Sequence, residues 1–326
     1  AVYGKKKSYL YKLYIVLAVL VWLPLSLCAM DSTKLSFRSI TISDGLSNNI
    51  INTIYKDKRG FVWLGTQTGL DRFDGIDVIS FPQFAARIIY AIAESDSVSV
   101  WVGTDKGLMK FDRKTERVED VMLDNKALEV KTIYADGKGK LLVGTTCGLF
   151  VYKDSNFSKV LFDPNALSST NFLTDIIEGK ENTLWITSQN GLIEYHVASG
   201  KYEVYKYTVS GGTNTFSCLA LANERLFLGT SGKGLLSFDL KKKIFSTCPD
   251  LGNRYIKSLV ADDKDILYVG TNGSGVKLVD TSTGQEISSI EHAADGKGIC
   301  SNAVYSLLKD DDMFFVGTYM GGLSYT

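Results

Sequence analysis

The sequence has little proline, almost no histidine and no excess of either charge. Its 326 residues include 4 prolines and 2 histidines, and 36 basic residues balance 36 acidic ones. A net charge of zero gives no basis for a nucleic-acid partner, because binding to a phosphate backbone depends on a strongly basic surface. His196 and His292 occur without a serine or cysteine motif that would make either a catalytic base, so we expect both to be structural.

Long hydrophobic runs are also rare, and the longest covers residues 13–27. Lysines precede this run and small residues follow it. The run is shorter than the roughly 20 residues that span a bilayer, so residues 1–30 are predicted to be a secretory signal peptide. We therefore expect residues 31–326 to be exported and periplasmic, touching the membrane only through the signal or an anchor.

The end of the predicted signal leaves an alternative open. Residues 25–28 resemble a bacterial lipoprotein cleavage sequence, although Leu27 stands where a small residue is usual. Cleavage, lipidation at Cys28 and retention as a membrane anchor therefore all stay possible outcomes of this segment.

One short pattern occurs seven times in the remainder of the chain. Most copies read bulky apolar, apolar, glycine and threonine, followed after a short turn by glycine and leucine or valine. The first glycine marks each copy: Gly65, Gly103, Gly144, Gly229, Gly270 and Gly317, with Thr187 in that position in the fourth copy. Successive marks are 38, 41, 43, 42, 41 and 47 residues apart. A period near 40 residues with strand-like contents is typical of propeller blades.

Each repeat divides into four strands at its turns. In the first repeat the apolar and alternating segments predict strands over residues 49–56, 61–65, 70–73 and 78–81. The bulky residue two positions before each mark lies in the second strand. Because every repeat has one, we expect it to pack against the neighbouring blade rather than to bind a ligand. The predicted fold class is all-β, a seven-bladed β-propeller of four-stranded antiparallel blades.

The two ends of the repeat region are complementary. The seventh repeat stops after its third strand, whereas residues 35–42 form an extra strand-like segment that carries Phe37 and Ile40. We predict that this N-terminal strand completes the last blade and closes the ring, which leaves no open sheet edge. Residues 31–326 are then one propeller domain.

The cysteines give no metal-site pattern. Beyond Cys28, four cysteines are scattered without a CxxC pair or a histidine at ligand spacing, which argues against zinc. We interpret them as small buried side chains. If two of them pair, we expect Cys218 with Cys248, since both fall in the fifth repeat.

Two acidic clusters have the composition of a calcium loop. They comprise Asp262, Asp263 and Asp265, and Asp310, Asp311 and Asp312. Both fall where the other repeats have the turn between their first and second strands, so we expect solvated turns rather than calcium sites. No cofactor is expected.

Several segments resemble a known family. The resemblance rests on Ser-Asp-Gly-Leu-Ser-Asn-Asn at residues 43–49, Gly-Phe-Val-Trp-Leu-Gly-Thr at 60–66 and Gly-Leu-Asp-Arg-Phe-Asp-Gly at 69–75, and it returns at residues 300–307. These segments are similar to two-component regulator propeller repeats, which form the periplasmic sensor region of hybrid two-component histidine kinases. The resemblance implies a sensor that detects oligosaccharides. In the family this region usually holds two propellers and an immunoglobulin-like domain, followed by a membrane helix, a kinase, a receiver and a DNA-binding domain.

The chain lacks most parts of that plan. A second propeller, a spanning helix, a kinase and a DNA-binding part do not follow Thr326, so we expect a fragment of a larger sensor. Kinase activity would belong to the missing parts. Paired carboxylates suited to a glycosidase or lyase are not evident, and we do not expect this chain to be an enzyme.

Ligand binding is expected on the loops of one face. In a propeller the turns between second and third strands and the loops between blades emerge together, and such loops tolerate variation. The candidate binding residues are Gln67, Asp105, Lys106, Asn190 and Tyr319 from the turns, and Arg87, Arg254 and Tyr255 from the interblade loops. The arginines and tyrosines offer planar donors and aromatic faces, which suit a sugar or an acidic sugar.

Two function classes stay open. In the first, the propeller is the ligand-sensing part of a signalling receptor whose ligand is an oligosaccharide. In the second, it is a structural interaction module whose face docks a downstream domain or a second protomer. A secreted carbohydrate-active enzyme is a third and weaker reading. The polar composition of the loops favours the receptor. The sequence identifies neither the sugar nor the oligomeric state.

Overall fold

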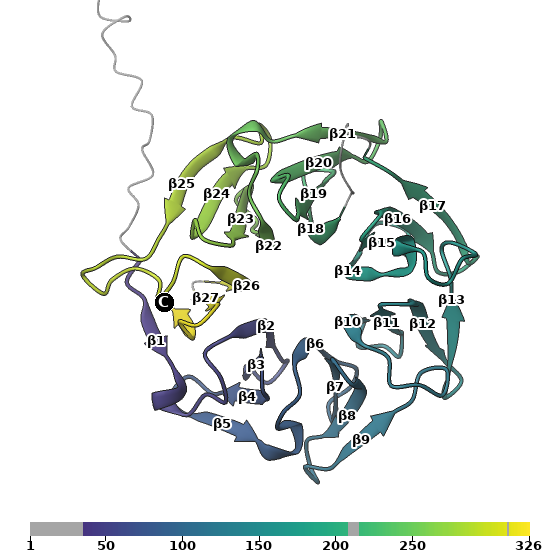
Figure 1. Cartoon of the computed structure of the whole chain (residues 1–326), viewed down its shortest axis with the longest axis horizontal. Helices are drawn as coiled ribbons and strands as arrows, with labels where there is room; N and C mark the ends of the chain where they lie inside the picture. Colours follow the sequence, from purple (N-terminus) through teal and green to yellow (C-terminus); the bar gives the residue numbers. More distant parts are fainter. Residues whose placement is uncertain (1–34, 208–214, 312) are drawn as a thin grey trace, which may run out of the picture. The chain divides into compact units, whose positions relative to one another are not determined.

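Seven four-stranded antiparallel sheets surround a central axis in the unit Phe37–Thr326 (Figure 1). The computed structural model describes residues 35–207, 215–311 and 313–326, and the predicted signal segment, Cys28 and Asp312 lie outside them. The predicted seven-bladed propeller is confirmed. Within the described residues, no helix has the length and apolar character needed to cross a membrane.

Each blade runs from an inner strand beside the axis to an outer strand at the rim. Blades one and two contain β2 (Ile51–Lys56), β3 (Val62–Thr66), β4 (Leu70–Phe73), β5 (Val78–Phe81), β6 (Ile89–Glu94), β7 (Ser99–Thr104), β8 (Gly107–Asp112) and β9 (Val118–Val121). Blades three and four contain β10 (Val130–Ala135), β11 (Leu141–Thr145), β12 (Gly148–Lys153), β13 (Asn156–Val160), β14 (Leu173–Glu178), β15 (Thr183–Ser188), β16 (Gly191–His196) and β17 (Lys201–Tyr205). The predicted strands of the first repeat match the observed ones to within two residues.

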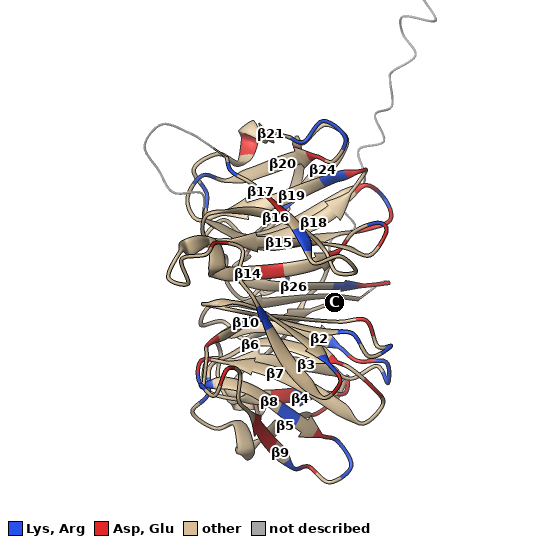
Figure 2. Ribbon diagram, turned by 90° about the vertical axis from the view of Figure 1, so that its right-hand side faces the viewer, with Lys and Arg blue, Asp and Glu red and all other residues tan. Residues whose placement is uncertain are grey.

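The remaining blades follow the same order. They contain β18 (Phe216–Ala222), β19 (Arg225–Thr230), β20 (Leu235–Asp239), β21 (Ile244–Thr247), β22 (Ile256–Ala261), β23 (Ile266–Thr271), β24 (Val276–Asp280), β25 (Glu286–Ile290), β26 (Val304–Asp310), β27 (Met313–Thr318), β28 (Leu323–Tyr325) and β1 (Arg38–Ile40). Short 3-10 helices cover Ile42–Asp44, Pro82–Phe84, Ser169–Asn171 and Pro249–Leu251. Figure 2 shows the ring from the side, with residues of both charges interspersed over its surface.

The N-terminal strand closes the ring as predicted. β1 pairs antiparallel with β28, with Ile40 opposite Leu323, and forms the outer edge of blade seven. Phe37, just before the strand, packs in a cluster with Phe314, and Ile40 packs in another cluster with Leu323, while the two residues between them are exposed. Residues three apart in a strand point to opposite faces, so the closing segment contacts two core clusters. The strand is shorter than the predicted 35–42, because a 3-10 helix capped by the Thr41 side chain begins at Ile42.

The core consists of clusters between neighbouring blades. The bulky residue two positions before the mark is buried in all seven copies. Trp63 of β3, for example, packs with Phe81 of its own blade and with Phe111 of blade two. The predicted packing role of this position is confirmed.

The marking glycines are required by the close approach of two inner strands. A Cβ atom on Gly65 would lie 2.5 Å from Thr53 Cγ2 and 2.7 Å from Ile89 Cγ2 of the next blade. We predict that Gly65→Ala lowers the free energy of unfolding by about 1–3 kcal/mol, through overpacking, in urea denaturation. Gly252→Ala is the control, because Gly252 has φ −60° and a Cβ there would meet only Pro249 O at 3.5 Å. Equal effects of the two changes would contradict the steric explanation.

The expected pairing of Cys218 with Cys248 is wrong, since both cysteines are free. Cys218 lies on the inner strand β18, whereas Cys248 follows the outer strand β21 of the same blade. Two strands separate these edges, and strand spacing places them roughly 14 Å apart. A disulfide needs Cα atoms within about 7 Å of each other. Both thiols are buried, as the sequence predicted.

The first acidic cluster occupies the predicted turn between β22 and β23, and of the second cluster Asp310 ends β26 and Asp311 follows it in the turn. Asp262 Oδ1 accepts hydrogen bonds of 2.9 Å from the backbone N–H groups of Lys264 and Ile266, and Asp310 forms an ion pair with Lys56. Within the part of the chain that the structure describes, no group of three or more His, Cys, Asp or Glu side chains could hold a metal ion.

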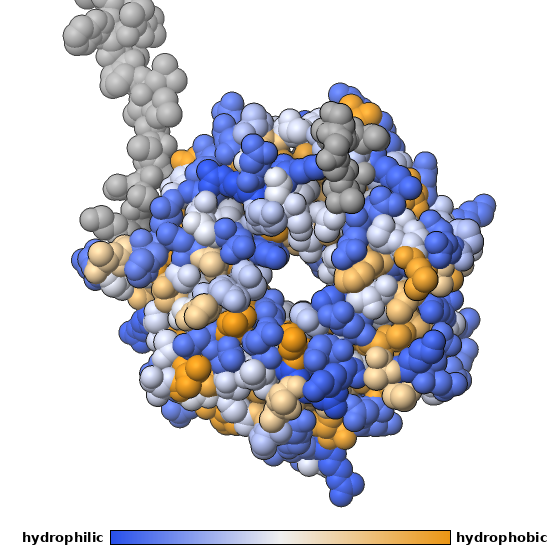
Figure 3. All heavy atoms as spheres, in the orientation of Figure 1, coloured by the Kyte–Doolittle hydropathy of each residue, from blue (hydrophilic) through white to orange (hydrophobic). Residues whose placement is uncertain are grey.

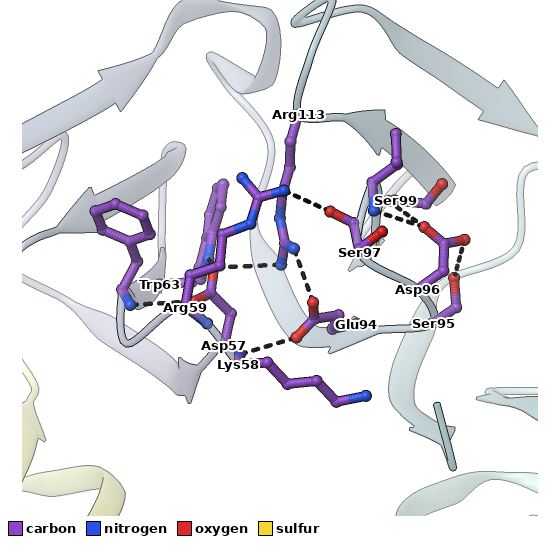
Figure 4. A network of polar contacts seen from close by, with 12 residues as sticks. Asp57, Lys58, Arg59, Trp63, Glu94, Ser95, Asp96, Ser97, Ser99 and Arg113 are labelled. Atoms are coloured by element: carbon purple, nitrogen blue, oxygen red, sulfur yellow. Dashed lines mark hydrogen bonds and ion pairs between the residues drawn. The ribbon is translucent and has the colours of Figure 1, made fainter. Parts of the chain in front are cut away.

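A buried charge cluster joins blades one and two (Figure 4). Arg113 Nη1 lies 2.8 Å from Glu94 Oε1, and Arg113 Nη2 lies 3.2 Å from Asp57 Oδ2. The three side chains are at most 4% exposed. Asp57 also accepts a hydrogen bond of 2.9 Å from Trp63 Nε1, so the cluster ties a turn of blade one to the core between the blades.

Candidate functional site

The turns between second and third strands lie against the loops that lead into the same blades. Asp105 Oδ1 of the β7–β8 turn accepts a hydrogen bond of 3.0 Å from Ile88 N, and Lys106 Nζ donates to Ala86 O at 3.1 Å. Blade four repeats this contact, since Asn190 Nδ2 donates to Thr170 Oγ1 at 3.3 Å. We call the side of the ring that carries these turns and loops the turn face.

Every inner strand has an irregularity just after it leaves the turn face. The pairing register shifts between the first and third residues of all seven inner strands, as in a β-bulge. The first residue is buried in each case, and the second lies at the wall of the central channel. These second residues are Asn52, Tyr90, Lys131, Thr174, Ser217, Lys257 and Tyr305, and we call them the channel ring.

The channel is hollow and polar enough to hold a small ligand. Its cavity has a volume of about 330 Å³ and is lined by residues of all seven inner strands. That volume is at the lower end of the range for small-molecule sites. Figure 3 shows the central opening, with hydrophilic residues predominating around it.

Two lysine–tyrosine pairs give the channel ring its chemistry. Lys131 Nζ lies 3.6 Å from the centre of the Tyr90 ring, and Lys257 Nζ lies 5.2 Å from the centre of the Tyr305 ring. Each pair joins neighbouring blades, and both distances are within the range of cation–π contacts. The small hydroxyl residues of blades four and five separate the two pairs. The ring therefore offers cations, aromatic surfaces and hydroxyl groups around one opening.

The Tyr90 hydroxyl is fixed in its protonated form. Burial, and after it the nearby Glu129 carboxylate, raises the pKa of Tyr90 to about 12. Glu129 also lies 2.5 Å from Lys131 Nζ, so it neutralises part of the charge of that pair. At neutral pH Tyr90 is a hydrogen-bond donor.

Two of the residues predicted from the sequence reach the channel ring. The Tyr319 ring lies 5.2 Å from the Tyr305 ring, centre to centre, and is 42% exposed. Asp105 is close enough that its negative charge contributes to the raised pKa of Tyr90. Tyr319 with Tyr305 forms an exposed aromatic surface at the channel mouth.

Other predicted residues have local structural partners. Arg87 lies 3.6 Å from Asp120 of the outer strand β9, and Lys106 and Asn190 hold the interblade loops as described above. Gln67 N donates to Ile50 O, and Arg254 O accepts a hydrogen bond from Gly234 N. Tyr255 is 53% exposed and forms a backbone bridge with Ser231. A binding role for these residues remains a prediction.

None of the seven residues of the channel ring was predicted from the sequence. Its members occupy one position of the repeat, the residue after the buried apolar residue that begins each first strand. Aligning the repeats on their marking glycines places Tyr90, Lys131 and Lys257 in one column, whereas Tyr305 is one residue nearer to its glycine and falls outside that column. The bulge that turns these residues towards the axis cannot be recognised in the sequence of a single repeat.

Both histidines have local partners. His196 Nδ1 lies 3.1 Å from Thr183 Oγ1, and His292 Nδ1 lies 2.9 Å from Ile299 O. Neither lines the channel cavity. These contacts agree with the structural role expected of both.

Comparisons with known proteins identify the repeat and support the fold. Residues 45–68 match the family model of the two component regulator propeller. Histidine kinase P4 of Formosa agariphila is 28% identical over 199 residues, which are 59% of this chain and 12% of the kinase. The sequence-based recognition of the repeats is confirmed.

Two solved structures from B. thetaiotaomicron have the same fold. The extracellular domain of the putative hybrid two component system BT4673 matches with a TM-score of 0.75 and 22% identity, covering 89% of this chain and 39% of that one. The extracellular domain of the putative hybrid two component system BT3049 matches with a TM-score of 0.74 and 20% identity, covering 89% and 41%. The chain thus spans less than half the length of each of these relatives.

Proposed function

The chain carries a two-component regulator propeller repeat, and from this premise we propose that it is the ligand-sensing propeller of a periplasmic hybrid two-component receptor. The ligand is an oligosaccharide, and it binds in the central channel at the turn face. The channel ring is the observation that supports this proposal, because its convergent polar and aromatic groups surround a cavity of about 330 Å³.

The chemistry of the ring suits a sugar. Tyr305 and Tyr319 offer an aromatic surface for the apolar face of a pyranose ring. Lys257, Thr174 and Ser217 line the same cavity, where the Lys257 ammonium can donate hydrogen bonds to sugar hydroxyls and the two hydroxyl oxygens can accept from them. Their convergence on one opening supports the proposal more than either group alone would.

Signalling is proposed to pass through parts of the receptor outside this chain. A ligand shifts a receptor only if it binds one arrangement of its parts more tightly than another. The chain contributes the binding surface, and the kinase activity belongs to other domains.

We predict that changes in the channel ring weaken oligosaccharide binding. The test is calorimetric titration of residues 31–326 with di- to tetrasaccharides of glucose, galactose, mannose, xylose and galacturonate, here called the panel. Tyr305→Ala and Lys257→Met are expected to reduce the affinity for the bound member at least about tenfold, since each removes a contact of about 1.4 kcal/mol or more. Arg87→Ala is the control, because Arg87 is paired with Asp120.

Two outcomes would contradict the proposal. If Arg87→Ala abolishes binding and the channel variants do not, the site lies on the outer loops instead. If folded, monodisperse protein binds no member of the panel, the alternative of a docking module without a small-molecule ligand replaces the sensor.

A further inference from the structure

Blade four departs from the repeat at two facing positions. In the other six blades the marking glycine pairs with a small residue on the inner strand: Thr53, Ala91, Thr132, Cys218, Ser258 and Ser306. In blade four the facing pair is Asp175 and Thr187. A carboxylate and a β-branched residue thus replace a small residue and a glycine together.

Steric contact couples the two changes. A Cβ on Gly144 would lie 2.5 Å from Thr132 Cγ2, and a Cβ on Gly229 would lie 2.5 Å from Cys218 Sγ. Thr187 has a Cβ, so the side chain opposite it cannot take the usual position. Asp175 instead reaches towards blade five, where its Oδ2 accepts a hydrogen bond of 3.1 Å from Leu219 N.

The same substitution contacts the channel ring. Thr174 Oγ1, one of the ring hydroxyls, donates to Thr187 Oγ1 at 2.8 Å. Asp175 follows Thr174 along the strand and lines the same cavity, one residue farther from the turn face. Blade four therefore places a carboxylate directly below the ring.

This carboxylate has no cationic partner among the residues that the structure describes. Besides the bond from Leu219 N to Oδ2, its Oδ1 accepts a hydrogen bond of 2.9 Å from Ile176 N, and the side chain lines the channel cavity. Burial raises the pKa of Asp175 to about 6, against the lowering effect of its hydrogen bonds from Leu219, Ile176 and Thr132. A partly desolvated, unpaired carboxylate is unfavourable for the fold, and such departures from a repeat are typical of functional positions.

The neighbouring titratable groups do not supply Asp175 with a cationic partner. On the adjacent strand β18 the Cys218 thiol has its pKa raised to about 12, first by burial and then by Asp175, and it stays neutral. On the other adjacent strand, β10, Lys131 is paired with Glu129. Lys257 lies in the ring two blades away.

We propose that Asp175 is a specificity-determining residue of the channel site, whose carboxylate accepts hydrogen bonds from the hydroxyl groups of a sugar residue inserted end-on from the turn face. This inference rests on the proposed function and names the group that its ligand must present. A terminal sugar with adjacent hydroxyls donates further hydrogen bonds to the carboxylate, whereas a ligand without these donors displaces water from it and gives no donor in return.

The binding test compares the wild type with Asp175→Asn, which keeps the size of the side chain and removes its charge. For the panel member that the wild type binds, we expect at least about tenfold weaker binding by the variant at pH 7.5. The wild-type affinity should fall as the pH drops below about 6, because the acceptor becomes protonated, whereas the affinity of the variant should change little. Equal affinities at pH 7.5 would overturn the inference.

A second variant tests the cost of the carboxylate without any ligand. The double change Asp175→Thr with Thr187→Gly restores the pair found in blades one and three. The folded-state pKa of Asp175 lies above its ordinary value, so its penalty is present above about pH 6 and disappears as the pH falls towards 4. We expect the double variant to melt about 3 °C higher than the wild type at pH 8, with little difference at pH 4.

The two experiments distinguish a failure of the inference about Asp175 from a failure of the proposed function. A double variant that melts lower at pH 8 shows that Asp175 supports the fold, which overturns the inference and leaves the proposed sensor intact. Wild-type protein that binds no member of the panel overturns the proposed function, and the inference with it.

Discussion

Replacing Arg113 with methionine is expected to lower the free energy of unfolding by about 3–5 kcal/mol. The change leaves Asp57 and Glu94 without their cation, and both carboxylates are almost completely buried. The desolvation of two unpaired charges is the largest single penalty that one substitution can create in this cluster. Chemical denaturation at pH 7, followed by circular dichroism, measures the loss.

Arg59→Met is the matched control for this prediction. Arg59 belongs to the same polar network (Figure 4), but its side chain is exposed and donates only to Ser97 O. We expect its loss to change the free energy of unfolding by about 1 kcal/mol or less. A loss of less than about 1 kcal/mol for Arg113→Met as well would show that water reaches the cluster and that it is not a buried ion pair.

The second large effect is expected at the ring closure. Phe37→Ala combined with Ile40→Ala removes the two buried apolar side chains of the closing segment, one just before β1 and one at its end, and large-to-small changes in a core cost about 2–5 kcal/mol each. Phe37 packs against Phe314, and Ile40 is part of the cluster that contains Leu323. We expect the variant to lose most of its stability and to aggregate, because the edge of β28 becomes available to other chains. Thermal unfolding and light scattering report both effects.

The control for the closure leaves the buried side chains in place and changes only exposed residues of the strand. Arg38→Ala with Ser39→Ala alters two exposed residues of the same strand and leaves its backbone pairing with β28 in place. We expect a change within about 0.5 kcal/mol per residue. A small effect of the apolar pair would mean that blade seven is stable with three strands and that closure does not hold the ring together.

The fold was predictable because the same packing residues recur in register in the copies of the repeat. Six of the seven copies have a glycine where the inner strand of the next blade approaches, and the bulky residue two positions before the mark fills the space between blades in all seven. Seven copies in register therefore indicate both the strands and their packing. The closing strand was predictable because the spacing of Phe37 and Ile40 recurs in two outer strands, at Val118 and Val121 and at Ile287 and Ile290.

The site was only partly predictable. The face and Tyr319 were predicted, but Arg87 pairs with Asp120 of an outer strand, because a long arginine side chain can reach any nearby carboxylate, and no local pattern reveals which one. The channel ring depends on a bulge in each inner strand, which is a property of the assembled sheet. Asp175 had one visible signal, the threonine that replaces the fourth marking glycine, but its meaning depends on the residue paired with it.

The most direct test of the account is a crystal structure of the propeller bound to the member of the panel that it binds. We expect the sugar in the central channel, with one ring against Tyr305 and Tyr319 and its terminal hydroxyl groups on Asp175. A sugar bound at Arg87 or elsewhere on the outer loops, with the channel free of it, would contradict the account.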